Sequence, residues 1–514
     1  MAKNLFNSVK MTRPNRNKFD LSHDVKMSLN MGYLYPTMVT ECVPGDKFRI
    51  GCESMLRFSP LIAPIMHRVD VSMHYFFVPN RIVWPNWEKY ITNTKEGENL
   101  PAFPTLVMNP TLWGAGLPDY MGIPPVPDTK SSVISALPFA ALQKIWNEYY
   151  RDQNVMEEVD YLLEDGDNTA ARGVALCTLR RRSWEHDYFT SALPFAQKGD
   201  PVVIPVGVPG NVPVKFNNAD PSYEDNILTD QSGWVSSPDP ATHGMQMPMN
   251  NDPELPVGMP YAETENLELG STTINDLRRA FRLQEWLEKA ARGGSRYIEN
   301  ILAHFGVRSS DKRLQRPEYI TGTKSPVIIS EVLNTTGTNE APQGNMAGHG
   351  VSVTQGSYGG YYCEEHGYII GVMSVMPKTA YMQGIPRHFL KWQDPFQFFW
   401  PSFAHLGEQE IQNQELYAFN TPNDDVATFG YVPRYAEYKF ENNRVAGQMR
   451  TSLKHWHMAR EFFTPPALNQ TFIESTPTTR IFAVTEDNPN QLIAHVLHKV
   501  WASRLMPKFG TPTF

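Results

Sequence analysis

Proline is the feature that most limits the fold of this chain, because 42 of its 514 residues are prolines. This is about 8%, against about 5% in an average protein. Proline lacks a backbone N–H and fixes φ, so it interrupts helices and the interior of sheets. We therefore expect short strands separated by many turns and loops, with few long helices. Hydrophobic residues make up 41% of the sequence, which is enough for a sizeable core.

Length and charge narrow the possibilities further. The chain exceeds the usual size of one domain, and one core with long insertions fits it better than several domains. The formal net charge of −8 excludes a protein whose whole surface condenses nucleic acid, so any contact with DNA must be local. Four scattered cysteines form neither a disulfide framework nor a metal motif, and we expect them to be reduced and buried: Cys42, Cys52, Cys177 and Cys363.

The N-terminal segment is basic and has no hydrophobic signal-peptide core. No stretch of the sequence approaches the 18 or more apolar residues that span a membrane. We therefore expect no membrane insertion, and synthesis in a cytosol-like compartment.

Alternating residues predict a strand over 68–77. The polar residues Arg68, Asp70, Ser72 and His74 alternate with Val69, Val71, Met73, Tyr75 and Phe77, as expected when one face of a sheet is buried. Two further strands are predicted on either side of the turn at 44–46. The run 364–376 predicts a short buried strand, and 491–506 is assigned to a strand although its periodicity also fits a helix.

Two helices are predicted. Over 138–151, apolar residues recur at helical spacing, and this helix is expected to pack against a sheet. Over 271–293, Thr273 and Asp276 form an approximate capping box, and Gly293-Gly294 ends the helix. Short strands with helical insertions favour a mainly β fold, a double-sheet antiparallel sandwich of the jelly-roll kind that viral capsids, lectins and cupins share.

The stretch 201–260 has an unusual composition. It holds eleven prolines, seven acidic residues and a single lysine, with no apolar period that could form a core. An ordered loop of this length is uncommon unless it has a function. Packaged phosphate would repel so acidic a stretch, so we expect it to face outward.

Several long strings carry a family resemblance. They are TINDLRRAFRLQEWLEKAARGGSRYIENILAHFGVRSSDKRLQRPEYI (273–320), GGYYCEEHGYIIGVMSVMPKTAYMQGIPRHF (359–389), WPSFAHLGEQEI (400–411), YVPRYAEYKF (431–440), LPFAALQKIWNEYYRDQN (137–154), HRVDVSMHYFFVPNRIVW (67–84) and MPKFGTP (506–512). These strings closely resemble the major capsid proteins of gokushoviruses, which are small icosahedral single-stranded DNA phages of the microvirus type. The likeness runs nearly from end to end.

The resemblance implies an eight-stranded antiparallel viral jelly roll, a β-sandwich with long loop and helical insertions. It implies one capsid domain over 31–514, after the basic arm at 1–30 that the N-terminal cations indicate, and a T=1 shell of sixty copies around circular single-stranded DNA. The implied partners are an internal scaffolding protein, a minor capsid or DNA pilot protein and a host cell-surface receptor. The implied location is the virion, after assembly in the bacterial host cytoplasm.

The resemblance also implies that 201–260 forms protrusions at the threefold axes for host attachment. The candidate receptor-contacting residues of this surface loop are Asp220, Glu224, Asp225, Asp230, Trp234 and Asp239.

Basic residues near the two ends of the chain are candidates for interior DNA contact. They are Lys3, Lys10, Arg13, Arg16 and Lys18 in the N-terminal arm, and Lys499, Arg504 and Lys508 near the C-terminus. Clustered cations neutralise phosphate, and nearby aromatic residues such as Phe6 and Phe19 offer surfaces on which bases stack. The alternative is that these cations bridge neighbouring subunits or stay solvated. The run Arg180-Arg181-Arg182 has the same two interpretations, phosphate contact or salt bridges between subunits.

Enzyme signatures are weak. His455, His457 and Glu461 form an H-x-H-x3-E string like the first cupin motif, but the upstream glycine and a second motif are missing. The sequence contains no Walker A loop, G-x-G-x-x-G, HExxH or G-x-S-x-G motif. We therefore expect no catalytic residue, metal or cofactor. The two rival functions are a cupin-like metalloenzyme and a receptor-binding module that forms no shell.

Two aromatic runs fit either subunit interfaces or the core: FQFFWPSF (396–403) and VPNRIVWPNW (78–87). The sequence alone does not separate these interpretations.

Overall fold

The computed structural model describes residues 14–92, 98–200, 202, 214–217, 249–250, 260–262, 274–333, 346–356, 358–484 and 490–509. The chain divides into two compact units. The main unit combines residues 1–198 with 289–514, and the inserted unit comprises 199–288.

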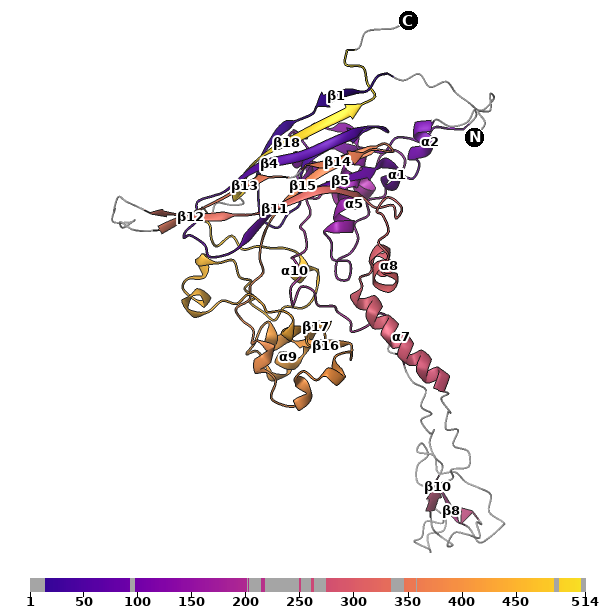
Figure 1. The fold of residues 1–514 in the computed structure, drawn as a ribbon, viewed down its shortest axis with the longest axis vertical. Helices are drawn as coiled ribbons and strands as arrows, with labels where there is room; N and C mark the ends of the chain where they lie inside the picture. Colours follow the sequence, from indigo (N-terminus) through magenta and orange to yellow (C-terminus); the bar gives the residue numbers. More distant parts are fainter. Residues whose placement is uncertain are drawn as a thin grey trace. The chain divides into compact units, whose positions relative to one another are not determined.

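Two antiparallel sheets form the framework of the main unit (Figure 1). In the first sheet, the order is β1-β18-β4-β13-β12, with β2 also paired to β18 and β14 to β4. In the second sheet, the order is β11-β5-β15-β3. The first sheet's strands are β1 (Asn17–Asp20), β2 (His23–Leu29), β4 (Lys47–Phe58), β12 (Ile328–Leu333), β13 (Met346–Gln355), β14 (Gly359–Tyr362) and β18 (Leu492–Arg504). The second sheet's are β3 (Tyr35–Cys42), β5 (Val69–Pro79), β11 (Glu318–Pro326) and β15 (Gly367–Pro377).

Strand pairing in these sheets is nested. Early strands pair with late ones in reverse order, as β2 with β18, β3 with β15, β4 with β13 and β5 with β11. The chain therefore runs like one long hairpin whose two arms alternate between the sheets.

Shorter elements fill the connections. The main unit's helices are α1 (Asn80–Val83), α2 (Trp87–Thr92), α3 (Pro110–Trp113), α4 (Leu117–Tyr120), α5 (Leu137–Tyr149), α6 (Thr169–Cys177), α8 (Tyr297–Phe305), α9 (Pro422–Val426) and α10 (Gln470–Ile473). Two small antiparallel sheets join β6 (Thr105–Met108) to β7 (Ser132–Ser135), and β16 (Glu408–Gln412) to β17 (Thr428–Pro433). The inserted unit contains β8 (Val214–Asn217), β9 (Met249–Asn250) and β10 (Pro260–Ala262), and α7 (Ile274–Arg292) begins in it.

One hydrophobic core lies between the two sheets. Leu56 and Val496 of the first sheet and Met73 and Val375 of the second belong to the same buried cluster. The four predicted free cysteines are all buried without disulfides, and Cys42, Cys52 and Cys363 belong to this core. The architecture is therefore mainly β and consistent with a β-sandwich.

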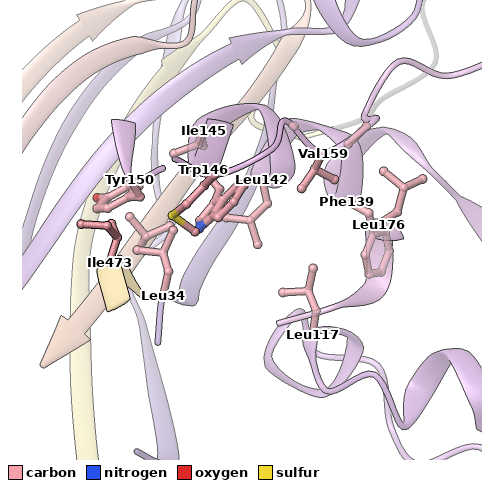
Figure 2. Close-up of a cluster of buried hydrophobic side chains, with 14 of the residues drawn as sticks. Leu34, Leu117, Phe139, Leu142, Ile145, Trp146, Tyr150, Val159, Leu176 and Ile473 are labelled. Atoms are coloured by element: carbon pink, nitrogen blue, oxygen red, sulfur yellow. The ribbon is translucent and has the colours of Figure 1, made fainter. Parts of the chain in front are cut away.

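A second core covers the other face of the second sheet. Helix α5 begins with Leu137-Pro138, where proline is tolerated because the first helical N–H groups have no partner. Its Ile145 and Trp146 join Phe76 and Ile370 of the second sheet in one cluster, part of which Figure 2 shows. The two central strands of the second sheet, β5 and β15, are thus buried on both faces.

Most predicted elements of regular structure are confirmed. Strands occupy 69–79, 367–377 and 492–504 and lie on either side of the 44–46 turn, and helices occupy 137–149 and 274–292. The expectation that the strand at 68–77 has only one buried face was wrong, because every residue of β5 except His74 is buried. Its polar residues have partners instead: Asp70 lies 3.3 Å from Lys378 Nζ, and Ser72 Oγ lies 2.8 Å from Ser374 Oγ.

Part of the predicted basic arm belongs to the first sheet, because β1 and β2 both pair with β18. Within the described residues, no helix is both long enough and apolar enough to cross a membrane.

Candidate nucleic-acid interface

One face of the first sheet is open to solvent. Along β18, buried residues such as Val496 and Val500 alternate with outward-facing residues that include His495, Lys499 and Trp501. The period of two sends every second side chain away from the core. Figure 1 shows β1, β18 and β4 side by side, so their outward residues share this face.

Strand β4 contributes three cations to the same face. Lys47, Arg49 and Arg57 are exposed and lie opposite Ser503, Trp501 and Ile493 of β18 respectively. Directly opposed residues of antiparallel strands project to the same side of a sheet. This register therefore places the arginine side chain of Arg49 beside the indole of Trp501.

Aromatic side chains lie among these cations. The guanidinium of Arg49 is 4.5 Å from the ring centroid of Tyr358, and Lys47 Nζ is 5.9 Å from that of Tyr362. Tyr358, Tyr362 and Trp501 are each between 45% and 50% exposed. Such rings can stack on unpaired bases while the cations contact phosphate.

The charge of this face is positive although the whole chain is acidic. We call it the basic sheet face; its cations are Lys18, Lys26, Lys47, Arg49, Arg57 and Lys499, and its acids are Asp20, Asp24 and Glu53. Lys499 forms an ion pair with Glu53, and this hydrogen bond raises the pKa of the lysine. Three cations therefore remain in excess of the acids.

The predicted DNA-contacting residues fall into three groups. Lys18 lies on the basic sheet face, opposite Ser503, and Lys508 is exposed beside Phe509. Arg16 donates to the backbone oxygens of Ser503 and Gly45, both at 2.7 Å. Lys3, Lys10 and Arg13 lie outside the described residues.

Arg504 is occupied within the chain. Its Nε lies 3.1 Å from the carboxylate of Asp46, and its Nη2 donates to the Glu41 carbonyl at 2.7 Å. Burial raises the pKa of Asp46, although the neighbouring arginines Arg504 and Arg16 act in the opposite direction. Arg16 and Arg504 thus tie the end of β18 to the turn before β4.

The three consecutive arginines serve the core. Arg180 donates to the Ala175 carbonyl at 2.8 Å, Arg181 to the Ser475 carbonyl at 2.7 Å, and Arg182 to Ser374 Oγ at 2.9 Å. Each guanidinium is therefore engaged inside its own chain, which supports a structural role, and contact with phosphate or with a neighbouring subunit stays a prediction.

The cupin-like string is also engaged in local contacts. His457 Nε2 lies 2.8 Å from the Met449 carbonyl oxygen, and Glu461 pairs with Lys454 and Arg480. In the part of the chain that the structure describes, no three His, Cys, Asp or Glu side chains are grouped so that they could hold a metal.

The six candidate receptor residues of the 201–260 loop, Asp220 to Asp239, lie outside the described residues. A family model described as "Capsid protein (F protein)" matches residues 7–514.

The chain belongs to this capsid protein family. It is 33% identical to "Capsid protein VP1" of Chlamydia phage 1, over 100% of this chain and 98% of that protein. It is 34% identical to "Capsid protein VP1" of Bdellovibrio phage phiMH2K, over 99% and 97%, and 31% identical to that of Spiroplasma virus 4, over 97% and 95%. The predicted gokushovirus-type relationship is confirmed, and the chain is a structural component of a virion, not an enzyme.

Of the cations on the basic sheet face of this capsid protein, Lys18 and Lys499 were predicted from the sequence, whereas the three cations of β4 were not. The signal was present in KFRIGCESMLRF (47–58), where Lys47, Arg49 and Arg57 alternate with apolar residues. The predicted cations cluster near the two ends of the chain. The pairing of β4 with β18 instead brings together cations that are more than 400 residues apart in the sequence.

Proposed function

We propose that this capsid protein is the major subunit of a T=1 icosahedral shell that encloses a circular single-stranded DNA genome. The observation that carries the proposal is the basic sheet face, where six cations and three exposed aromatic rings gather on a chain of net charge −8. Phosphate neutralisation needs local cations, and stacking on aromatic rings tolerates any base sequence. Both properties suit a shell that must hold a whole genome.

The nested strand pairing supports an eight-stranded viral jelly roll. The eight strands β2, β3, β4, β5, β11, β13, β15 and β18 form two four-stranded layers, each early strand pairing with its late counterpart. Folding one long hairpin over itself into two sheets generates the jelly-roll arrangement of capsid domains. The remaining strands β1, β12 and β14 extend the first sheet.

The proposal assigns the two ends of the chain to the interior of the shell. Lys508, together with Lys3, Lys10 and Arg13 of the basic arm at 1–30, adds to the cations of the basic sheet face, which already include Lys18. Arg16 and Arg504 act as positioning residues, since their guanidinium groups hold the backbone at 45 and 503 and the Asp46 carboxylate. Residues 31–514 then form the capsid domain, with 199–288 as its largest insertion.

The acidic stretch 201–260 is proposed to face outward as threefold protrusions for host attachment, through Asp220, Glu224, Asp225, Asp230, Trp234 and Asp239. Its seven acids against one lysine would be repelled by packaged phosphate. An internal scaffolding protein, a DNA pilot protein and a host receptor are the proposed partners, with assembly in the host cytoplasm.

The proposal is tested by expressing the chain together with its native gene neighbours, followed by electron microscopy, sedimentation and nuclease treatment. We expect closed particles with threefold protrusions and protected single-stranded DNA. Small oligomers without protected nucleic acid, in the presence of a folded scaffolding protein, would favour the receptor-binding module instead.

A variant pair tests the role of the basic sheet face. Lys47→Gln, Arg49→Gln and Arg57→Gln together remove three cations from the face, whereas the matched control Lys89→Gln, Lys130→Gln and Arg313→Gln removes three exposed cations elsewhere in the main unit. We expect the first variant to form particles that lose DNA at lower salt, because each lost phosphate contact weakens ionic binding. Equal DNA retention in both variants would refute the assignment.

A further inference from the structure

A second exposed surface differs in character from the basic sheet face. It consists of aromatic side chains from the segment 389–400 and from residues 438 and 440, and we call it the aromatic platform: Phe389, Trp392, Phe396, Phe398, Phe399, Trp400, Tyr438 and Phe440. Each is between 45% and 77% exposed. The sequence left open whether the FQFFWPSF run is core or surface, and these exposures place most of it on the surface. The VPNRIVWPNW run, by contrast, contains the fully buried Val78, Val83 and Trp84.

One ring contact and one shared cation, Lys391, join three members of the aromatic platform: Phe398, Phe399 and Tyr438. Phe399 lies 6.3 Å from Tyr438 between ring centroids, and Lys391 Nζ is 4.0 Å from the centroid of Tyr438 and 6.0 Å from that of Phe398. Phe396 packs against Phe403, which is not part of the platform, with 5.3 Å between the ring centroids.

The size of the aromatic platform exceeds what a monomer normally exposes. An aromatic side chain can bury about 150–250 Å². Eight such side chains, each about half exposed, therefore offer roughly 800 Å², whereas the largest apolar patch of a typical monomer is about 300–600 Å². Roughly 800 Å² is also the share that each partner contributes to a standard protein–protein interface.

The platform is held in place before any partner binds. The Asp394 carboxylate caps a 3-10 turn by accepting from the Phe396 backbone N–H at 2.8 Å, and Trp400 Nε1 donates to the Pro395 carbonyl at 3.0 Å. Below it, Arg387 Nη1 lies 2.6 Å from the buried Glu415 carboxylate. A preorganised surface loses little conformational entropy on association.

The cation that lies over two platform rings, Lys391, is already neutralised. Lys391 Nζ lies 2.6 Å from the Glu437 carboxylate, and the two side chains are only 4% and 11% exposed. A neutralised cation does not attract phosphate, so nucleic acid is a poor partner for this surface. A dry aromatic contact with another protein surface suits it better, because interface cores are enriched in aromatic residues and depleted of charge.

We propose that the aromatic platform is a contact surface for a second copy of this chain in the shell. The inference deepens the proposed function and rests on it, since a shell requires repeated contacts between identical subunits. It names the surface that makes one of them, and the area of the platform matches the share of a stable interface.

The first test places a photo-crosslinking amino acid at position 392 in the full chain, expressed with its gene neighbours. In purified particles, we expect crosslinks from position 392 to peptides of a second copy, identified by mass spectrometry. Crosslinks only to another viral protein, only to DNA, or to nothing in intact particles would overturn the proposal.

The second test compares two variants, each of which replaces two exposed aromatic residues by serine. Trp392→Ser with Phe398→Ser truncates the platform, and the matched control Phe305→Ser with Phe463→Ser truncates two aromatic residues that are 76% and 89% exposed outside it. We expect the platform variant to stay folded by circular dichroism and to lose particle yield by at least about tenfold, as truncated interface aromatics weaken each contact. Equal yields from the two variants would contradict the proposal.

Failure of the inference is distinguishable from failure of the proposed function. If the unaltered chain forms no particles, the shell itself is refuted, and crosslinking at position 392 in the oligomers that do form still tests the platform. If particles form with protected DNA but position 392 does not reach a second copy, the platform alone is refuted.

Discussion

The two sheets of the main unit share a core but differ in what covers their other face. The second sheet packs against α5 and its neighbours, so β5 and β15 are buried almost throughout. The first sheet leaves its other face exposed, and β4 and β18 alternate between buried and exposed residues. The second sheet therefore supports the fold from inside, while the first sheet presents a surface that can bind a partner.

Polar residues have different roles on the two sheets. In the second sheet they are paired within the chain, as His74 Nδ1 with Tyr150 Oη at 2.6 Å and Asp70 with Lys324 at 3.2 Å. Buried polar groups need such partners, because desolvation without a hydrogen bond is costly. In the first sheet, Arg57 and Lys26 extend into solvent, where they remain available to phosphate.

The largest effect is expected when an aromatic residue is removed from the second sheet. Phe76 is 1% exposed and contacts Tyr149 with 4.7 Å between ring centroids, so Phe76→Ala should lower the free energy of unfolding by about 3–5 kcal/mol. Tyr362→Ala, at a ring that is 50% exposed on β14 of the first sheet, should change it by less than about 1 kcal/mol. Denaturant titration measures the free energy of unfolding of both variants. Equal losses would contradict the difference in burial between the two sheets.

A smaller effect is expected from pH. Burial lowers the pKa of His74 to about 4, with the positive charges of Arg182 and Lys324 acting in the same direction. Between its unfolded pKa near 6.5 and about 4, the unfolded chain binds a proton that the folded chain does not. Stability is therefore complete above about pH 6.5 and falls as the pH drops towards 4, by an amount on the order of 2 kcal/mol.

The variant His74→Gln should make this part of the curve of unfolding free energy against pH less steep, while His67 and His498, whose pKa burial also lowers to about 4, keep the rest of the slope. The matched control His495→Gln makes the same replacement at an exposed imidazole of the basic sheet face. A curve for His74→Gln that falls as steeply as the wild-type curve would argue against the neutral buried imidazole.

The smallest effect on stability is expected at the basic sheet face itself. Trp501→Ala removes an indole that is 47% exposed, so the free energy of unfolding should change by less than about 1 kcal/mol. Binding of single-stranded DNA should weaken by about 1–3 kcal/mol for each base that stacks on the ring. Fluorescence titration with an oligonucleotide measures the binding loss, and unchanged affinity would remove Trp501 from the interface.

Local patterns predicted the elements of this fold well. The alternation at 68–77, the apolar spacing at 138–151 and the run at 491–506 correspond to β5, α5 and β18. The double burial of β5 was not predictable, because its second cover comes from α5, which lies some 60 residues further along the chain. A strand shows its own period but not what is packed on its far side.

The candidate site was predicted only in part, for a related reason. Cationic residues at the chain ends were visible as a cluster in the sequence, and Lys18 does lie on the basic sheet face. Arg16 and Arg504 were also predicted to contact DNA. Their partners inside the chain, which are backbone carbonyls and the Asp46 carboxylate, depend on how the ends of β18 and β3 lie against each other. Long-range strand pairing decides which cations are free.

We propose that the exposed face of the first sheet contacts the packaged single-stranded DNA. A cryo-electron microscopy map of DNA-filled particles tests it most directly, since it locates Arg49, Arg57 and Trp501 relative to the packaged DNA. We predict that the basic sheet face points into the shell, with nucleic-acid density against these side chains. A map in which this face points outward, or is covered by a neighbouring subunit without DNA, would contradict the account.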